Sequence, residues 1–257
     1  MNNFILIIPA RLKSTRYPNK VIKKINKKEV FVHVWEKCLK ACEKTNVEGT
    51  KNVLIACEKN QIFVATPDKK IIEICKKKGI NYFKTSQNCL TGTDRIIEIS
   101  KKIKKDFYIN VQADEILVSP KSILKVIKEC KKYKSNFVIN AFTKIIESHD
   151  YYSLSVPKVV LDNDNFLNYI SRSPIPGKKK KKFTKALKQV CIYAYPIKLL
   201  SKIKLNKKSY NESFEDIEIL RFIDNGIKVK MIKAQGSKIA IDTYKDYKKA
   251  IVYLRGK

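Results

Sequence analysis

Long apolar runs are almost absent from this sequence of 257 residues. The first one, from Phe4 to Ala10, stops at Arg11. It is too short to cross a membrane and lacks the flanking residues of a secretory signal peptide. We therefore expect a cytoplasmic protein without membrane insertion.

Paired cysteines are also missing. The seven cysteines are scattered, odd in number and contain no C-x-x-C pair, which argues against a disulfide framework or a zinc site of the usual spacing. Cys38, Cys42, Cys75 and Cys130 lie at helix-like positions. We expect them to be buried thiols that pack in the core of a protein in a reducing compartment.

Acidic residues are scarce, with 24 Asp and Glu against 55 Lys and Arg, and the formal net charge is +31. A positive charge of this size can bind nucleic acid. However, lysine is spread from end to end, and the sequence has neither a basic patch interleaved with aromatic residues nor an RNA-binding signature. We expect a general attraction for small anions and no nucleic-acid partner.

The residues that are present alternate between short β-branched runs and segments with helical spacing, which predicts an α/β fold with a mostly parallel sheet and helices on both faces. After Phe137 the pattern changes to a hairpin and further strands, typical of a smaller α+β lobe. The expected strands are 4–8, 62–65, 107–112, 159–161, 166–170, 190–195 and 227–234, and the expected helices are 29–44, 69–78, 93–105, 120–132, 214–224 and 243–254.

The segment Pro9-Ala-Arg-Leu-Lys-Ser-Thr-Arg-Tyr-Pro-Asn-Lys20 follows the first strand directly. Ligands of open α/β sheets bind beyond the carboxyl ends of the strands, and hydroxyls, backbone amides and fixed cations are suited to a triphosphate. The sequence contains neither G-x-x-x-x-G-K-[ST] nor G-x-G-x-x-G, so this loop is not a P-loop or a dinucleotide fingerprint.

This loop resembles the I-P-A-R-x-x-S-T-R-x-P-x-K signature of 3-deoxy-manno-octulosonate (Kdo) cytidylyltransferases, the CMP-Kdo synthetases. Eight further segments resemble motifs of that family in the same order: V-A-T-P-D at 64–68, T-G-T-D-R at 91–95, N-V-Q-A-D-E at 110–115, K-V-V-L-D at 158–162, Y-I-S-R-S-P-I-P at 169–176, I-Y-A-Y at 192–195, E-I-L-R at 218–221 and I-D-T-Y at 241–244.

The resemblance implies a reaction in which a sugar hydroxyl attacks the α-phosphorus of CTP and pyrophosphate leaves. It implies Mg²⁺ on Asp114 and Asp242, which with Arg11 and Lys20 form the expected catalytic set. Arg11 and Lys20 would hold the triphosphate, supported by Ser14 and Arg16, and the remaining nucleotide-binding positions are Ala10, Thr66, Gly92 and Arg95. The sugar-binding positions are Gln112, Arg172, Gln189, Tyr193, Tyr195 and Glu218.

Some of these residues have plainer alternatives. Arg95 could instead form a salt bridge with a neighbouring acid, and either tyrosine could be part of the core. For Arg172 the guanidinium suits a carboxylate, because it can pair with it in bidentate fashion.

Departures from the family pattern concentrate in its sugar half. Gln189 replaces a histidine, Ile219 a glutamine, Ala113 a glycine and Ile116 a proline, and about 45–60 is an extra stretch whose structure the sequence leaves open. Lost polar groups change the pairing of sugar hydroxyls, so the acceptor can differ from Kdo. The alternatives are a nucleotidyltransferase of this fold with a non-ulosonate acceptor and a non-catalytic CTP- or nucleic-acid-binding protein.

The resemblance also implies one nucleotidyltransferase domain over 1–257. Its nucleotide-binding core would comprise about 1–135 and 225–257, and its sugar-binding and dimerisation lobe about 136–224. A homodimer would form through about 150–210.

Overall fold

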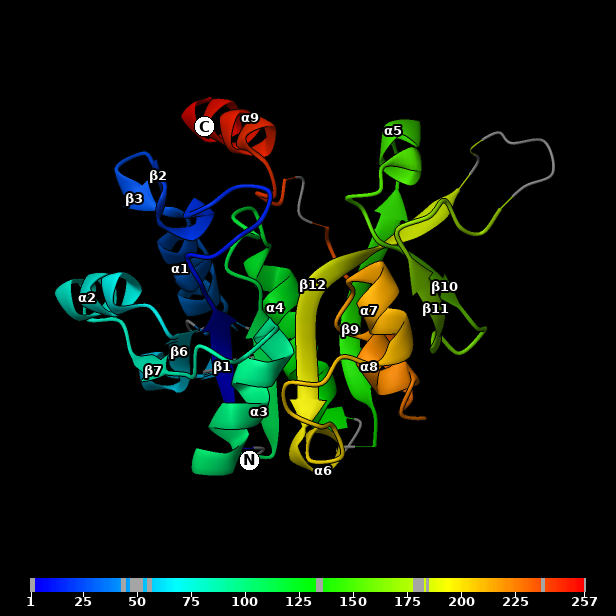
Figure 1. Ribbon diagram of the computed structural model, residues 1–257, viewed down its shortest axis with the longest axis horizontal. Coiled ribbons are helices and arrows are strands. Elements are labelled where there is room, and N and C mark those ends of the chain that lie inside the picture. Colours follow the sequence, from blue (N-terminus) through cyan, green and yellow to red (C-terminus); the bar gives the residue numbers. More distant parts are fainter. Residues whose placement is uncertain are drawn as a thin grey trace.

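The computed structural model describes residues 3–42, 45–46, 53–54, 57–132, 136–177, 183, 185–236 and 239–256. Within them, a nine-stranded sheet forms the centre of the molecule (Figure 1). Along its main path the strand order is β11-β10-β12-β8-β1-β6-β7, and β9 and β13 join through β12. Strands of the expected nucleotide core and of the expected lobe therefore share one sheet.

The first half of the sheet is parallel. β1 (Phe4–Pro9) lies between β6 (Ile62–Thr66) and β8 (Phe107–Val111), and β7 (Tyr82–Lys84) follows β6. β1 is buried on both faces because its side chains alternate between two cores, with Leu6 in one and Ile7 in the other. This is how a strand without polar alternation is accommodated in a parallel sheet.

Helices cover both faces of the sheet (Figure 1). α1 (Val30–Cys42), α2 (Lys69–Lys78) and α4 (Pro120–Lys132) supply apolar residues to the core that contains Leu6. α3 (Gly92–Lys102), α6 (Ile197–Leu200) and α8 (Leu220–Ile223) supply the core that contains Ile7. The predicted α/β class is confirmed, and antiparallel pairing enters only where the lobe joins the sheet.

The lobe is organised around β12 (Ala186–Pro196), which pairs antiparallel with β8, β10 (Lys158–Leu161) and β9 (Val138–Ile145). β10 and β11 (Leu167–Ser171) form the predicted hairpin, and β13 (Val229–Lys233) runs parallel to β9. β7, β9 and the short helix α5 (Ser148–Tyr152) were not predicted.

The remaining elements are short or peripheral. β2 (Lys24–Ile25) and β3 (Lys28–Glu29) form a hairpin beside α9 (Tyr244–Arg255), near the C-terminus (Figure 1). Two 3-10 turns, Lys20–Ile22 and Lys59–Gln61, precede α1 and β6. In the extra stretch at 45–60, β4 (Thr45–Asn46) pairs with β5 (Val53–Leu54), so part of it is a two-stranded sheet.

The predicted helix over 214–224 was wrong as a continuous element. The chain forms α7 (Tyr210–Glu215), then a turn, then α8. Asp216 ends α7 in the left-handed region, with φ of 51°, a conformation that a helix cannot continue through. The turn carries Glu218 to a contact with another element, described below.

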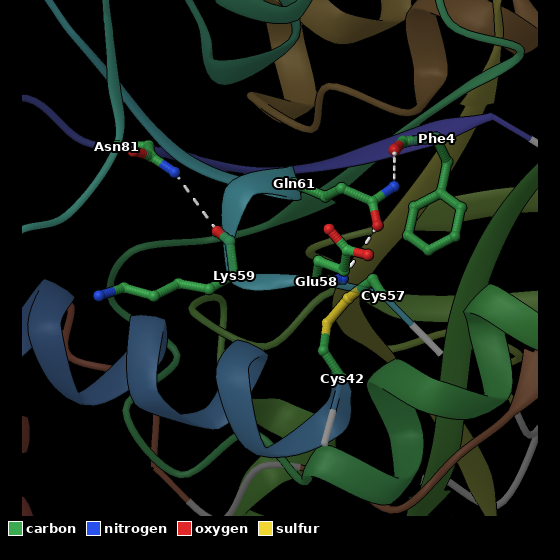
Figure 2. The surroundings of a disulfide bond; sticks show 7 residues. All are labelled: Phe4, Cys42, Cys57, Glu58, Lys59, Gln61 and Asn81. Carbon is green, nitrogen blue, oxygen red and sulfur yellow. Dashed lines mark hydrogen bonds between the residues drawn. A yellow bond between two sulfur atoms is a disulfide. The ribbon is translucent and has the colours of Figure 1, made fainter. Parts of the chain in front are cut away.

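The expectation that the cysteines are all thiols was also wrong. A disulfide joins Cys42, at the end of α1, to Cys57, just before the 3-10 turn at Lys59 (Figure 2). The other five cysteines are free, and four of them are buried. Spacing could not show this pair, because the two residues meet only after the chain has folded back from α1 towards β6. Among the described helices, none is long and apolar enough to cross a membrane.

Candidate active site

A cavity of about 930 Å³ opens at the carboxyl ends of β1 and β8, the place where an open α/β sheet binds its ligands. Its wall combines the loop after β1, the turn after β8, the segment before α9, and residues of α5, β12 and the α7–α8 turn. Of the predicted site residues it contains Ala10, Arg11, Ser14, Arg16, Lys20, Gly92, Arg95, Gln112, Asp114, Arg172, Gln189, Tyr193, Glu218 and Asp242.

Two hydrogen bonds fix the loop after β1 to neighbouring segments. The backbone N–H of Leu12 donates to Asp68 Oδ2 at 2.9 Å, and Arg11 Nη1 donates to the carbonyl of Leu90 at 2.9 Å. Asp68 is the last residue of the 64–68 motif, for which the sequence suggested no individual role. Through this hydrogen bond Asp68 orders the basic loop.

Lys20 joins the two predicted metal-binding aspartates. Its Nζ lies 2.6 Å from Asp114 Oδ2 and 3.0 Å from Asp242 Oδ1, and Arg16 Nη2 lies 3.2 Å from the same Asp242 oxygen. Burial is the largest single influence on the Lys20 pKa and lowers it, but the two carboxylates together outweigh burial and raise it. The ammonium is therefore held charged between two carboxylates.

A backbone contact brings these aspartates together across most of the sequence. The N–H of Ile241 donates to the carbonyl of Asp114 at 3.0 Å. Asp242 is thereby placed beside the turn that follows β8. Thr243 then caps α9 by accepting from the N–H of Asp246, which fixes the direction of the chain on the other side of Asp242.

The carboxylate pair meets the chemical requirements of Mg²⁺. This ion uses one or two protein carboxylates and completes its shell with phosphate oxygens and water. Asp114 and Asp242 are both part-exposed in the cavity and already share a cation, the Lys20 ammonium. Among the described residues, no cluster of three or more Asp, Glu, His or Cys offers a fuller ligand set.

Arg95 is a buried cation without a salt bridge in the part of the chain that the structure describes. Its Nη1 donates to Thr85 Oγ1 at 2.7 Å and to the carbonyl of Ser86 at 3.0 Å. Burial lowers its pKa, and the nearby Arg11 lowers it further. The alternative of a structural salt bridge is therefore not supported. Two guanidinium groups in one cavity wall repel each other, and a negatively charged group between them would relieve this repulsion.

Gly92 is the first residue of α3 and lies in the cavity wall, where neighbouring atoms leave little space for a side chain. A Cβ there would lie 3.3 Å from atoms of Pro9 and 3.4 Å from Gln112 Nε2. The Glu218 carboxylate accepts from Gly92 N at 3.2 Å, Thr93 N at 2.7 Å and Thr93 Oγ1 at 2.6 Å. Glu218, predicted to bind sugar, thus lies in the cavity wall and also stabilises the positive end of α3.

Arg172 is fixed by neutral partners. Its Nε donates to the carbonyl of Glu215, Nη1 to that of Leu154 and Nη2 to that of Asp216, at 2.6, 3.1 and 3.1 Å. These contacts use three of the five N–H donors and leave one on each Nη. The guanidinium is thereby oriented at the cavity wall with donors to spare, as binding a carboxylate requires.

Lys158 stabilises the segments that hold Arg172, a role that its motif did not suggest. It is fully buried, and its Nζ donates to the carbonyls of Ser153 and Arg172. It therefore ties Arg172, the residue after β11, to the 153–157 segment. Burial is the main reason that its pKa falls to about 8, and the neighbouring Arg172 adds to this effect.

Three residues singled out from the sequence lie away from the cavity wall. Thr66 is buried, and its hydroxyl accepts from Asp68 N. Tyr195 is buried in the core, stacked on Phe222, in line with the alternative of a core tyrosine. Ile219 is also fully buried in that core. Gln189, which replaces the family's histidine, therefore lines the cavity, whereas Ile219, which replaces its glutamine, does not.

Comparisons with known proteins agree with this geometry. A family profile described as cytidylyltransferase matches residues 5–239. A 3-deoxy-manno-octulosonate cytidylyltransferase of Parabacteroides distasonis is 34% identical, covering 99% of both chains, and that of Geotalea daltonii is 31% identical, covering 97% of both. A solved structure of CMP:2-keto-3-deoxy-manno-octonic acid synthetase in complex with CTP superposes with a TM-score of 0.83 at 27% identity, covering 99% of both chains.

Proposed function

The chain belongs to the cytidylyltransferase family, and from this membership we propose that it transfers CMP from CTP to Kdo or a closely related acidic sugar and releases pyrophosphate. One observation carries the proposal. The cavity at the carboxyl ends of β1 and β8 brings the Lys20–Asp114–Asp242 cluster together with the guanidinium groups of Arg11, Arg95 and Arg172 in one wall.

In this proposal, different residues of the cavity wall bind the nucleotide and the acceptor sugar. Arg11 and Arg95 neutralise phosphate oxygens, and Gly92 lets the nucleotide approach the end of β1 closely. Arg172 orients the acceptor through its carboxylate. The acceptor hydroxyl attacks the α-phosphorus of CTP, the bond to pyrophosphate breaks, and the hydroxyl proton is lost. Positioning and stabilisation of charge on the phosphate oxygens supply most of the catalysis in such transfers.

We include Mg²⁺ in this proposal, held by Asp114 and Asp242. Held there, the ion would supply positive charge that offsets the negative charge developing on the phosphate oxygens. Lys20 already places a positive charge between both carboxylates, so this position in the cavity favours a cation.

The test is pyrophosphate release from CTP by the purified protein with Mg²⁺, assayed with Kdo, related ulosonic acids and uncharged sugars. We expect release with at least one acidic sugar and formation of its CMP conjugate, with none from uncharged sugars. Release that is equal with and without a sugar, or that requires an uncharged sugar, would refute the proposed reaction.

A homodimer is part of the same proposal. Tyr210 and Phe214 of α7 are 75% and 73% exposed and contact each other with ring centroids 4.9 Å apart, and Leu154 in the predicted dimerisation region is 65% exposed. Exposed apolar side chains of this size often contact a partner. Light scattering on the wild type and on Phe214→Glu should show a dimer that the substitution weakens. The cytoplasmic location stays a prediction from the sequence.

A further inference from the structure

Gln189 lies in the cavity wall, and its environment decides which end of its amide faces the acceptor. It belongs to β12, where the pairing with β9 shifts register between Val190 and Tyr193. At this bulge the carbonyls of Val190 and Ile192 both accept from Asn140 Nδ2, at 3.1 and 2.9 Å. Carbonyl oxygens only accept hydrogen bonds. The amide nitrogen of Asn140 must therefore face the bulge.

The orientation of Asn140 then determines that of Gln189. With its Nδ2 committed to the bulge, Asn140 presents Oδ1 on its other side, and Oδ1 can only accept. Gln189 Nε2 lies 2.8 Å from this oxygen. Asn140 is fully buried, so reversing either amide would set like groups against each other where water cannot compensate. The orientation of both amides follows from the backbone of β12.

The carbonyl oxygen of Gln189 is left for a ligand. The Gln189 side chain is part-exposed in the cavity, and its Oε1 has no hydrogen-bond partner among the described residues. Gln189 N donates to the carbonyl of Pro157, at the end of the same 153–157 segment whose Leu154 carbonyl holds Arg172. Gln189 and Arg172 therefore both line the cavity and are both bonded to the 153–157 segment.

We propose that Gln189 determines acceptor specificity by presenting Oε1 as a hydrogen-bond acceptor, and that Asn140 is the positioning residue that holds it there. The inference rests on the proposed function, since the ligand is the acidic sugar whose carboxylate pairs with Arg172. That sugar then carries a hydrogen-bond donor, a hydroxyl or an ammonium group, at the place that faces Gln189.

The first experiment combines an enzyme substitution with substrate deletions. Wild type and Gln189→Met, which keeps side-chain length but removes the amide, are compared with Kdo, with analogues that each lack one hydroxyl, and with analogues that carry an amino group instead. For acceptors with the donor, Gln189→Met should lower kcat/KM about three- to tenfold, the size of one neutral hydrogen bond, without changing KM for CTP. The loss should vanish for one deoxy analogue.

The same experiment identifies the donor. A larger loss with the amino analogue than with the hydroxyl parent selects an ammonium group, and the reverse selects a hydroxyl. An equal loss with every analogue, or no loss with any, overturns the specificity role. If wild type turns over no acidic sugar at all, the proposed function fails together with this role.

The second experiment isolates Asn140. Asn140→Ser should no longer discriminate between the parent sugar and the one deoxy analogue that Gln189→Met identifies, although residue 140 does not touch the acceptor. The double variant with Gln189→Met should have no lower kcat/KM than Gln189→Met alone. Asn225→Ser is the matched control, because Asn225 Nδ2 also donates to a backbone carbonyl, that of Arg221, outside the cavity wall. Additive losses, or unchanged selectivity in folded Asn140→Ser, overturn the positioning role.

A spectroscopic measurement decides the positioning even if Asn140→Ser does not fold or no sugar reacts. In ¹⁵N-labelled wild type, one Nε2 proton of Gln189 should exchange with solvent at least about tenfold more slowly than those of the exposed Gln87, because Asn140 holds it. Two side-chain protons that exchange as fast as those of Gln87 contradict the hydrogen bond and with it the proposal.

Discussion

Lys20, Asp114 and Asp242 form a cluster in which each charge depends on the others. The ammonium is 12% exposed, and the two carboxylates that face it are 24% and 23% exposed. Two carboxylates at this distance from one cation would repel each other without it. The cluster therefore requires a positive charge between the aspartates at every stage, either from Lys20 or from a bound cation.

This dependence gives a prediction for Asp114. In Asp114→Asn we expect the fold to persist and kcat to fall by about a hundredfold or more, because one of the two carboxylates that would hold Mg²⁺ is lost, and with it the cation that would offset charge on the phosphate oxygens. Steady-state pyrophosphate release measures kcat, and circular dichroism checks the fold. Asp106→Asn, which alters an aspartate whose carboxylate accepts from Asn3 N and which is not among the residues of the cavity wall, should keep wild-type kcat. Near-normal kcat in Asp114→Asn, or full activity in excess chelator, would remove the metal assignment.

Lys158 gives a second prediction at this scale, since its folded-state pKa of about 8 lies below its ordinary value of 10.5. Between these two values the unfolded chain binds a proton that the folded protein does not, so the contribution of Lys158 to stability rises as pH increases from about 8 to 10.5. Below pH 8 the folded protein carries the full unfavourable effect of the buried ammonium. Burial raises the pKa of thiols such as Cys75 and Cys130, which act in the opposite direction above about pH 9, so the Lys158 contribution is measured as a difference between urea-unfolding pH profiles of the wild type and a lysine variant.

The comparison that isolates this effect uses two lysine variants. Relative to Lys158→Met, the wild type should gain stability between pH 8 and 10.5, because only the wild type carries the buried ammonium that loses its proton there. The exposed Lys198→Met should keep the pH profile of the wild type. Parallel pH profiles for the wild type and Lys158→Met would show that Lys158 titrates at its ordinary pKa.

Residue identities in the site were largely predictable, but their immediate partners were not. The motif matches pointed to Arg11, Lys20 and Asp114, and all three lie in the cavity wall. No pattern indicated that Arg172 is held by three carbonyls, because that contact set depends on the Asp216 turn. Ile219 appeared to alter the sugar site only because its burial could not be read from one sequence.

At the scale of elements, the N-terminus of α3 is fixed by the α7–α8 region. Arg221 of α8 donates to Asp94 of α3 at 2.7 Å and, with two nitrogens, to Glu212 of α7 at 2.6 and 2.7 Å. Burial raises the Asp94 pKa, but the Arg221 contacts prevail and lower it. Together with Glu218, this network fixes the helix that begins at Gly92.

We expect Arg221→Met to destabilise the protein by about 3–5 kcal/mol, because it leaves two buried carboxylates without their cation. Arg221→Lys should recover part of this loss but not all of it, since an ammonium cannot reproduce the paired contacts to Glu212. Urea unfolding measures both. Arg255→Met, in the exposed last turn of α9, should stay within about 0.5 kcal/mol of the wild type. A similarly small change in Arg221→Met would mean that the network adds little to stability.

The predicted helix boundaries agree with the structure where the sequence contains a local capping residue. α2 matches its predicted bounds, where Gly79 in the left-handed region ends the helix, and α9 begins one residue after its cap, Thr243. The helix predicted over 214–224 failed because its interruption is stabilised from outside, through Glu218 and α3. β9 was missed because its strand pairing is wholly long-range.

At the scale of the whole molecule, the net charge of +31 and the cavity act on the same substrates. CTP and an acidic sugar are both anions, and a protein with a large positive charge raises their concentration near its surface. The charge is not confined to one stripe, so its effect is a sum over many lysines. Salt should weaken this sum more than it weakens the half-buried contacts inside the cavity.

We therefore expect kcat/KM for CTP to fall at least about threefold between roughly 50 and 500 mM NaCl at fixed free Mg²⁺, with little change in kcat, since the Debye length shortens from above 10 Å to below 5 Å over that range. The double variant Lys245→Gln/Lys249→Gln, at the cavity wall, should show a lower kcat/KM at low salt and a shallower salt dependence. Lys101→Gln/Lys128→Gln removes the same charge from exposed sites outside that wall. If both double variants lose equally, attraction acts through net charge alone. If the wild type shows no salt dependence, the lysines do not assist substrate capture, and their abundance has no part in the reaction.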